Sequence, residues 1–186
     1  MDKPNIKQII LETERLLLRE VNPEILYNLF NFYTDEEIMA FMGLESETQL
    51  EMERLKYEGG YTTFRTSMKL FLIADKGTGK VIGRTGFHTW HLPHDRAEMG
   101  YAIHDERYMG KGYMKEANRA AIEFGFDQMR LNRIEAFTSP DNDASIALLH
   151  SLGFKEEGTL RQHYFKDNRI HDSVCYGLLK REYNGR

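Results

Sequence analysis

The chain has little of several features that would each define a class of protein. Its one cysteine, Cys175, excludes an internal disulfide and favours a reducing compartment. No apolar run approaches the roughly 20 residues that a membrane-spanning helix needs. The start of the sequence also lacks the apolar stretch of a secretory signal. We therefore expect a cytoplasmic protein that does not span a membrane.

An excess of basic residues is missing as well. Lys and Arg number 25 against 29 Asp and Glu, a formal net charge of −4, whereas a dedicated nucleic-acid binder is usually basic. The sequence shows no internal repeat and no low-complexity segment. With 41% hydrophobic and 29% charged residues in 186 positions, the composition predicts one globular domain over residues 1–186.

The apolar pattern and the helix-capping residues predict an alternation of helices and strands. The expected strands are 9–19, 69–75, 81–90, 96–104, 133–138, 154–159 with 164–166, and 170–179. The expected helices follow Asn22-Pro23, run from Thr34 to Met42, start near Ser46, and cover 111–129 and 142–152. This order predicts an α/β or α+β fold, in which helices cover a mixed sheet.

Two glycines stand at the expected junction between the strand 96–104 and the helix 111–129. The segment reads Arg107-Tyr-Met-Gly110-Lys-Gly112-Tyr-Met114. Two glycines one residue apart permit a tight turn and leave backbone N–H groups directed at one point at a helix N-terminus. The segment lacks both the Gly-Lys-Ser/Thr of the P-loop and the third glycine of the dinucleotide fingerprint. It predicts a cradle for a phosphate or pyrophosphate; a bare strand-to-helix turn is the alternative.

A second motif follows further along the chain. Asn142-Asp-Ala-Ser145 opens a helix that ends in Leu152-Gly153-Phe154, with an N-cap asparagine and a glycine directly after the helix. Together the two motifs resemble the GNAT superfamily of N-acetyltransferases. That family carries Arg/Gln-x-x-Gly-x-Gly/Ala and, later, Asn-x-x-Ser/Ala followed by Leu-Gly-Phe. The resemblance covers about residues 9 to 180, the expected core of the domain.

Within this superfamily the chain looks most like the ribosomal-protein alanine N-acetyltransferase group. The similar segments are Glu12-Thr-Glu-Arg-Leu-Leu-Leu-Arg19, Glu98-Met-Gly-Tyr101, Glu157-Gly158, and the ending His163-Tyr-Phe-Lys-Asp-Asn-Arg-Ile-His-Asp172. One stretch departs from the group, which is expected to place a carboxylate in the strand after Leu-Gly-Phe. This chain reads Arg161-Gln-His-Tyr-Phe165 there, with no acid until Asp167.

The resemblance implies a largely antiparallel sheet with a splayed strand pair that forms an acyl-CoA cleft. Acetyl-CoA would be the co-substrate, without a metal. The pantetheine arm would pair with the backbone of Ala102 and Ile103, and Asn142 would reach one of its amides. Ser145 would lie near the thioester sulfur. The pyrophosphate would be held by backbone N–H groups of Met109, Gly110, Lys111, Gly112, Tyr113 and Met114.

The same resemblance implies direct attack by an amine on the acetyl group. Ser145 is the candidate proton donor to the leaving thiolate, with a local capping role as the alternative. Glu98 is the candidate base, and a salt bridge with Arg84 or Arg96 is the alternative for that residue. Because of the departure at residues 161–165, His163, Tyr164 or water are further candidates for the base.

The acceptor is expected to be a primary amine, and a protein N-terminal α-amine is the first candidate. A small amine, such as a polyamine or an aminoglycoside, is the alternative within this class. A non-enzymatic acyl-CoA-binding module is the alternative from another class. Relatives of this kind often form homodimers. His88, His91 and His94 are not expected to bind zinc, because residues three apart in a strand face opposite sides.

Overall fold

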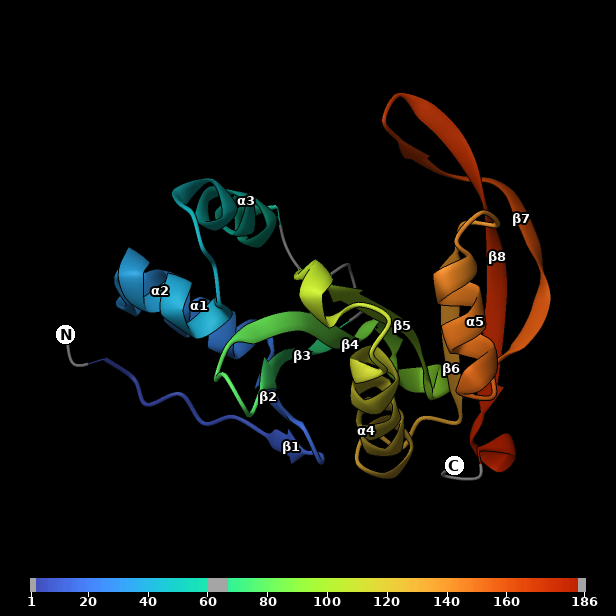
Figure 1. Cartoon of the computed structure of the whole chain (residues 1–186), viewed down its shortest axis with the longest axis horizontal. Coiled ribbons are helices and arrows are strands. Elements are labelled where there is room, and N and C mark those ends of the chain that lie inside the picture. Colours follow the sequence, from blue (N-terminus) through green and yellow to red (C-terminus); the bar gives the residue numbers. More distant parts are fainter. Residues whose placement is uncertain (1–2, 60–66, 184–186) are drawn as a thin grey trace.

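The computed structural model describes residues 3–59 and 67–183 (Figure 1). Within these ranges eight strands form one sheet, in the order β1-β2-β3-β4-β5-β6-β8-β7. The strands are β1 (Ile10–Glu12), β2 (Leu16–Val21), β3 (Ser67–Asp75), β4 (Val81–His91), β5 (Arg96–Ile103), β6 (Arg133–Thr138), β7 (Lys155–Lys166) and β8 (Arg169–Leu179). Only β5 and β6 pair in parallel; the other described neighbours are antiparallel. The predicted mixed, largely antiparallel sheet is confirmed.

Five α-helices accompany this sheet in the same ranges. They are α1 (Pro23–Phe32), α2 (Asp35–Met42), α3 (Glu47–Glu58), α4 (Tyr113–Asp127) and α5 (Asp143–Ser151). Asn22 caps α1, and Thr34 and Glu37 form a capping box at the start of α2. The helix expected to start near Ser46 is α3, which Ser46 caps and which ends at Glu58, before Gly59.

The prediction of one strand over residues 9–19 was wrong. The segment forms two antiparallel strands, β1 and β2, with Leu11 opposite Leu18. The polar stretch between them turns, because the Thr13 N–H donates to the Leu16 carbonyl at 3.0 Å. The Glu116 carboxylate of α4 holds the turn by accepting from the Thr13 hydroxyl at 2.6 Å and from the Arg15 N–H at 2.8 Å. A contact with the distant helix α4 therefore holds a turn that the local sequence pattern did not predict.

One helix boundary also differs from the prediction. The helix expected from Lys111 begins at Tyr113, because Gly112 has φ +78° and this left-handed conformation interrupts the helix. The strand predicted over 154–159 with 164–166 is β7, which is continuous, although its pairing with β8 shifts register between Leu160 and Tyr164. In Figure 1 the β7–β8 hairpin extends past the rest of the sheet.

Alternating side chains of β3 separate two hydrophobic clusters. Phe71 and Ile73 belong to the cluster that contains α4, and Phe71 meets Phe124 edge-on at 5.3 Å. Leu72 belongs to the cluster formed with α1, α2 and α3. The helices α1–α3 and α4 therefore cover opposite faces of the sheet, as Figure 1 shows. In the described ranges, no helix has both the length and the apolar character needed to cross a membrane.

Candidate active site

The parallel strands β5 and β6 separate part of the way along their length. They pair only at Arg96 with Arg133, Ala97 with Ile134, and Glu98 with Glu135. On its other side β5 stays paired with β4 as far as Ile103, opposite Gly83. Within the described sheet, the edge of β5 after Glu98 therefore has no strand partner, and its backbone N–H and C=O groups can pair with a ligand. The predicted splayed strand pair is confirmed.

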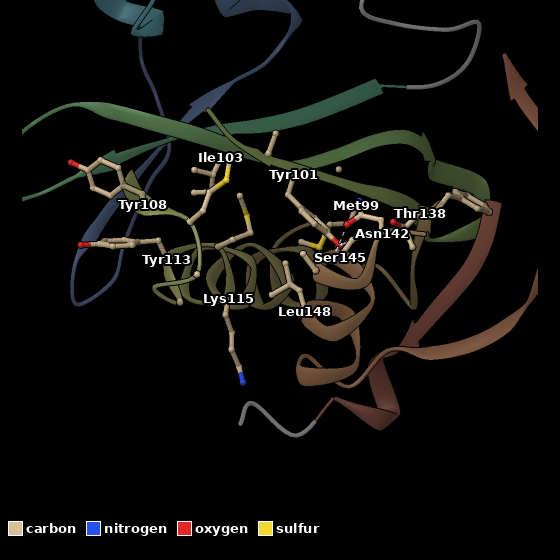
Figure 2. A pocket seen from close by; sticks show the side chains of 18 of the residues that line it. Met99, Tyr101, Ile103, Tyr108, Tyr113, Lys115, Thr138, Asn142, Ser145 and Leu148 are labelled. Atoms are coloured by element: carbon tan, nitrogen blue, oxygen red, sulfur yellow. Dashed lines mark hydrogen bonds between the residues drawn. The ribbon is translucent and has the colours of Figure 1, made fainter. Parts of the chain in front are cut away.

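A cavity of about 800 Å³ lies at this separation. Its lining comes from β4, β5, the glycine turn, α4, the end of β6 and α5. Residues from both faces of β5 line it, because Glu98, Gly100 and Ala102 alternate with Met99, Tyr101 and Ile103. The opening between β5 and β6 thus joins the two faces of the sheet. Ten of the lining side chains are labelled in Figure 2.

The glycine turn forms one end of this cavity. Gly110 has φ +69° and Gly112 has φ +78°, and both lie in the region that glycine adopts without strain. Gly112 is the N-cap of α4, and none of the described side chains caps that helix. The first N–H groups of α4 are therefore free to meet an anion, which the helix dipole also favours. A Cβ atom built on Gly110 would meet no heavy atom within 4 Å, so the cradle is open.

Arg15 fastens the glycine turn to the β1–β2 turn. Its Nε donates to Glu116 at 2.6 Å, and its Nη1 donates to the Lys111 carbonyl at 3.1 Å. The guanidinium also lies over the Tyr113 ring, 4.1 Å from the centroid. Sequence reasoning assigned no role to Arg15. The signal was its place in the Glu12-Thr-Glu-Arg segment, but its contact with Lys111 is made across 96 residues.

Helix α5 brings Ser145 to the middle of the cavity. The Asn142 side chain caps α5 by accepting from the Ser145 N–H at 3.1 Å. The Ser145 hydroxyl lies 2.7 Å from the Tyr101 hydroxyl, and Figure 2 shows the two side chains reaching toward each other from α5 and β5. Burial raises the pKa of Tyr101, with a smaller lowering effect from this hydrogen bond. Tyr101 therefore stays protonated near neutral pH and can donate to Ser145. Its role was missed in the sequence, although Tyr101 shares a strand face with Ile103.

Glu98 lies at the other end of the cavity, where β5 and β6 part. Its side chain is 25% exposed. Burial raises the pKa of Glu98, and the nearby charge of Glu135 adds to that effect. Its two candidate salt-bridge partners are engaged elsewhere: Arg96 donates to Glu135 at 2.6 Å, and Arg84 lies 3.6 Å from Glu53. Glu98 thus keeps a basic carboxylate facing the cavity.

His88 lies directly opposite Glu98 on β4 and also lines the cavity. The distance from His88 Nδ1 to Glu98 Oε2 is 3.7 Å. Burial lowers the pKa of His88, which favours a neutral ring. In the sequence His88 was considered only as a metal ligand. The pairing of β4 with β5 instead places His88 beside the Glu98 carboxylate.

The other two side chains considered as bases lie outside the cavity lining that the described residues form. His163 Nδ1 lies 2.9 Å from the Ser173 hydroxyl, and its ring packs against Phe137 at 5.1 Å. Tyr164 stacks on His171 at 5.1 Å within the β7–β8 hairpin. The geometry favours Glu98 over both.

Residues that could bind a metal or act as a nucleophile are not gathered here. Among the described residues, no group of three or more His, Cys, Asp or Glu side chains could hold a metal ion. Burial raises the pKa of the half-buried Cys175, so its thiol is a weak nucleophile near neutral pH. The arrangement therefore suits transfer between two bound molecules that meet in the opening between β5 and β6.

Known proteins share this architecture. A family model described as an acetyltransferase (GNAT) domain matches residues 15–155. The chain is 37% identical over 183 residues to the uncharacterized N-acetyltransferase p20 of Bacillus licheniformis, covering 94% of this chain and 98% of that protein. It is 26% identical over 193 residues to the ribosomal protein uS5-alanine N-acetyltransferase of Escherichia coli K12, covering 95% and 93%. A mutant spermidine N-acetyltransferase from Vibrio cholerae has the same fold, with a TM-score of 0.68 at 22% identity over 92% and 98% of the two chains.

Proposed function

The chain belongs to the GNAT family of N-acetyltransferases, and from this premise we propose that it transfers the acetyl group of acetyl-CoA to a primary amine. The resemblance predicted from the two sequence motifs is confirmed, and the relatives include a ribosomal-protein alanine N-acetyltransferase. One observation carries the proposal. The unpaired edge of β5 and the uncapped N-terminus of α4 meet in the same cavity.

The proposed binding of acetyl-CoA uses mainly the backbone. The arm of the coenzyme would pair with Ala102 and Ile103 of β5, as a further strand would. The N–H groups of the stretch from Met109 to Met114 would hold the pyrophosphate, and Lys111 would add a positive charge there. The open space around Gly110 and the free N–H groups of α4 fit this role. Asn142 is the proposed partner of a pantetheine amide.

The proposed chemistry is a direct transfer. The amine nitrogen attacks the carbonyl carbon of the thioester, a C–N bond forms, and the C–S bond breaks with its electron pair on sulfur. The amine gives up a proton, and Glu98 is the proposed base, acting directly or through a group that its carboxylate contacts. Ser145 is the proposed donor to the thiolate, and solvent restores its proton. The 2.7 Å contact between Ser145 and Tyr101 supports this role, because it orients the serine hydroxyl. Catalysis would come mainly from holding the two reactants together.

A protein N-terminal α-amine is the first candidate acceptor. A lysine side chain has a reference pKa near 10.4, so holding it neutral at pH 7.4 requires about 4 kcal/mol. An α-amine with a pKa near 8 requires less than about 1 kcal/mol. A site with one carboxylate of moderately raised pKa is easier to reconcile with the α-amine. The similarity to the uS5-alanine enzyme agrees with this candidate.

A small amine is the second candidate, since the chain also has the fold of a spermidine N-acetyltransferase. The stretch 161–165 without an acid favours it over a ribosomal-protein substrate. The family assignment favours either enzyme over an acyl-CoA-binding module.

Two measurements test the proposed function. Calorimetry with acetyl-CoA measures binding, and release of free coenzyme A measures turnover with a peptide that begins with alanine or with spermidine. We expect binding and release with one of these amines, and a mass increase of one acetyl group on that amine. Binding without release on any amine of a wider panel would support the module instead. Absence of binding would remove the basis of the proposal.

A further inference from the structure

The region around His88 contains a backbone irregularity that a plain strand would not need. The pairing of β4 with β5 shifts register between His88 and His91. Thr89, inside this irregularity, has φ +49°. A β-branched residue in the left-handed region is a conformational outlier, and such outliers cluster at functional sites.

The irregularity changes the direction of one side chain. In a regular strand, His88 and Thr89 would point to opposite faces of the sheet. Here the Thr89 hydroxyl lies 3.1 Å from His88 Nδ1. The Glu98 carboxylate lies 3.7 Å from the same Nδ1 atom. The Thr89 hydroxyl and the Glu98 carboxylate of β5 therefore both face Nδ1 of the imidazole.

These contacts orient the imidazole. With its proton on Nδ1, His88 donates to the Thr89 hydroxyl. This assignment leaves the lone pair of His88 Nε2 without a proton. The Nε2 atom lies above Gly100, because a Cβ built on that glycine would come within 2.9 Å of it. Gly100 itself lines the cavity, so the absence of a side chain there gives the imidazole its place beside the opening.

We propose that His88 is a catalytic residue that receives the proton of the attacking amine on Nε2, while Glu98, whose carboxylate lies 3.7 Å from Nδ1, stabilises the imidazolium that forms. This inference rests on the proposed acetyl transfer and deepens it. The nitrogen of the amine forms its bond to the acetyl carbon, its proton moves to His88 Nε2, and the thioester sulfur leaves with the C–S electron pair. His88 later returns the proton to solvent.

The electrostatic surroundings agree with this assignment. Burial lowers the pKa of His88, so the ring is neutral and able to accept a proton through the neutral range. Burial raises the pKa of Glu98, and its carboxylate lies 3.7 Å from Nδ1. Titratable groups from three other elements also lie near this pair. The groups are Glu135 of β6, His163 of β7 and Cys175 of β8. Arg96 and Arg133 both donate hydrogen bonds to Glu135.

The primary test replaces His88 with glutamine. We expect His88→Gln to lower kcat by about 10²-fold, the lower end of general base catalysis, with unchanged affinity for acetyl-CoA by calorimetry. In the wild type, kcat should fall with decreasing pH below the ordinary histidine pKa of about 6.5, and His88→Gln should lack this step. The control is His94→Gln, at an exposed histidine outside the strand, which should keep both kcat and the pH profile.

A second variant separates catalysis from folding. Thr89→Gly removes the hydroxyl that contacts His88 Nδ1 while permitting the positive φ, so we expect unchanged or higher thermal stability together with a several-fold lower kcat. A purely structural role for this segment predicts that stability and activity change together.

The outcomes distinguish this inference from the proposed function. If the wild type turns over the alanyl peptide or spermidine, and His88→Gln has a kcat within two-fold of the wild type with the same pH profile, only the role of His88 is overturned. Wild-type protein that releases no coenzyme A with any amine contradicts the acetyl transfer itself.

Discussion

The two ends of the cavity are built in different ways. The end at the glycine turn, which we call the carrier end, is lined by residues close together in the sequence, which we propose act through their backbone: Met109, Gly110, Gly112, Tyr113 and Met114. The end at Glu98, which we call the acceptor end, consists of side chains from β4 and β5 that meet across a register shift. Backbone groups bind an anion with little dependence on pH, whereas the acceptor end holds two groups with shifted pKa values. From this difference we propose carrier binding at one end and proton transfer at the other.

The largest expected effect tests the acceptor end. Glu98→Gln should lower kcat by about 10²-fold or more, because a positioned base typically contributes that much. Its affinity for acetyl-CoA should not change, since the carrier end is intact. Calorimetry and release of coenzyme A measure the two quantities. Glu51→Gln, on the exposed surface of α3, is the control. Equal losses of affinity and kcat in Glu98→Gln would show that the two ends are not separable.

The second prediction tests the carrier end with a matched pair of glycines. Gly110 and Gly79 have φ +69° and +71°, and neither has a heavy atom within 4 Å of an added Cβ. Valine at either position introduces strain of about 1–3 kcal/mol. We expect Gly110→Val to lose affinity for acetyl-CoA by roughly ten-fold or more, and Gly79→Val to lose only thermal stability. If calorimetry finds equal affinities in the two variants, the cradle has no part in binding.

The third prediction concerns the middle of the cavity, where the two ends meet. Ser145→Ala should lower kcat by about ten-fold, the size of one hydrogen bond made to a developing charge, at saturating acetyl-CoA. Ser151→Ala, in the same helix with its hydroxyl bonded to the Leu148 carbonyl, should have no such effect. Full turnover by Ser145→Ala would leave this serine with the capping role alone.

The smallest effect is expected from replacing Arg15, which supports the carrier end. The Arg15 side chain is 37% exposed, so its bond to Glu116 is partly screened by solvent. Arg15→Ala should weaken acetyl-CoA binding by roughly five-fold, or about 1 kcal/mol, because the Lys111 carbonyl and the Tyr113 ring lose their contact. The affinity of Arg15→Lys for acetyl-CoA should lie between those of the wild type and Arg15→Ala. Unchanged binding by both variants would mean that the glycine turn keeps its shape without this arginine.

The sequence predicted the carrier end well, because its determinants are local. Two glycines fix a turn, and Asn142 starts a helix, whatever lies around them. The arginine that supports the turn was not identified, since Arg15 contacts Lys111 only after the chain has folded. The same holds for the turn between β1 and β2, which the pattern 9–19 concealed and which Glu116 stabilises.

The acceptor end was predicted in part. Glu98 was named from the resemblance, but Tyr101, His88 and Thr89 were not given roles. Their proposed roles depend on neighbours that the local pattern does not reveal, namely Ser145 of α5 for Tyr101 and Glu98 of β5 for His88. In a regular strand Thr89 would face away from His88, whereas at a left-handed φ its hydroxyl lies 3.1 Å from His88 Nδ1.

By itself the sequence determined the family, the order of helices and strands apart from the β1–β2 turn, and the glycine turn before α4. These follow from residue preferences over short stretches, which act before distant segments meet. Only the tertiary structure decided where β5 and β6 part and which side chains face the opening. Strand register and the shift at Thr89 arise from pairing between different strands, and burial at those pairs shifts the pKa values of His88 and Glu98 on which the proposed chemistry depends.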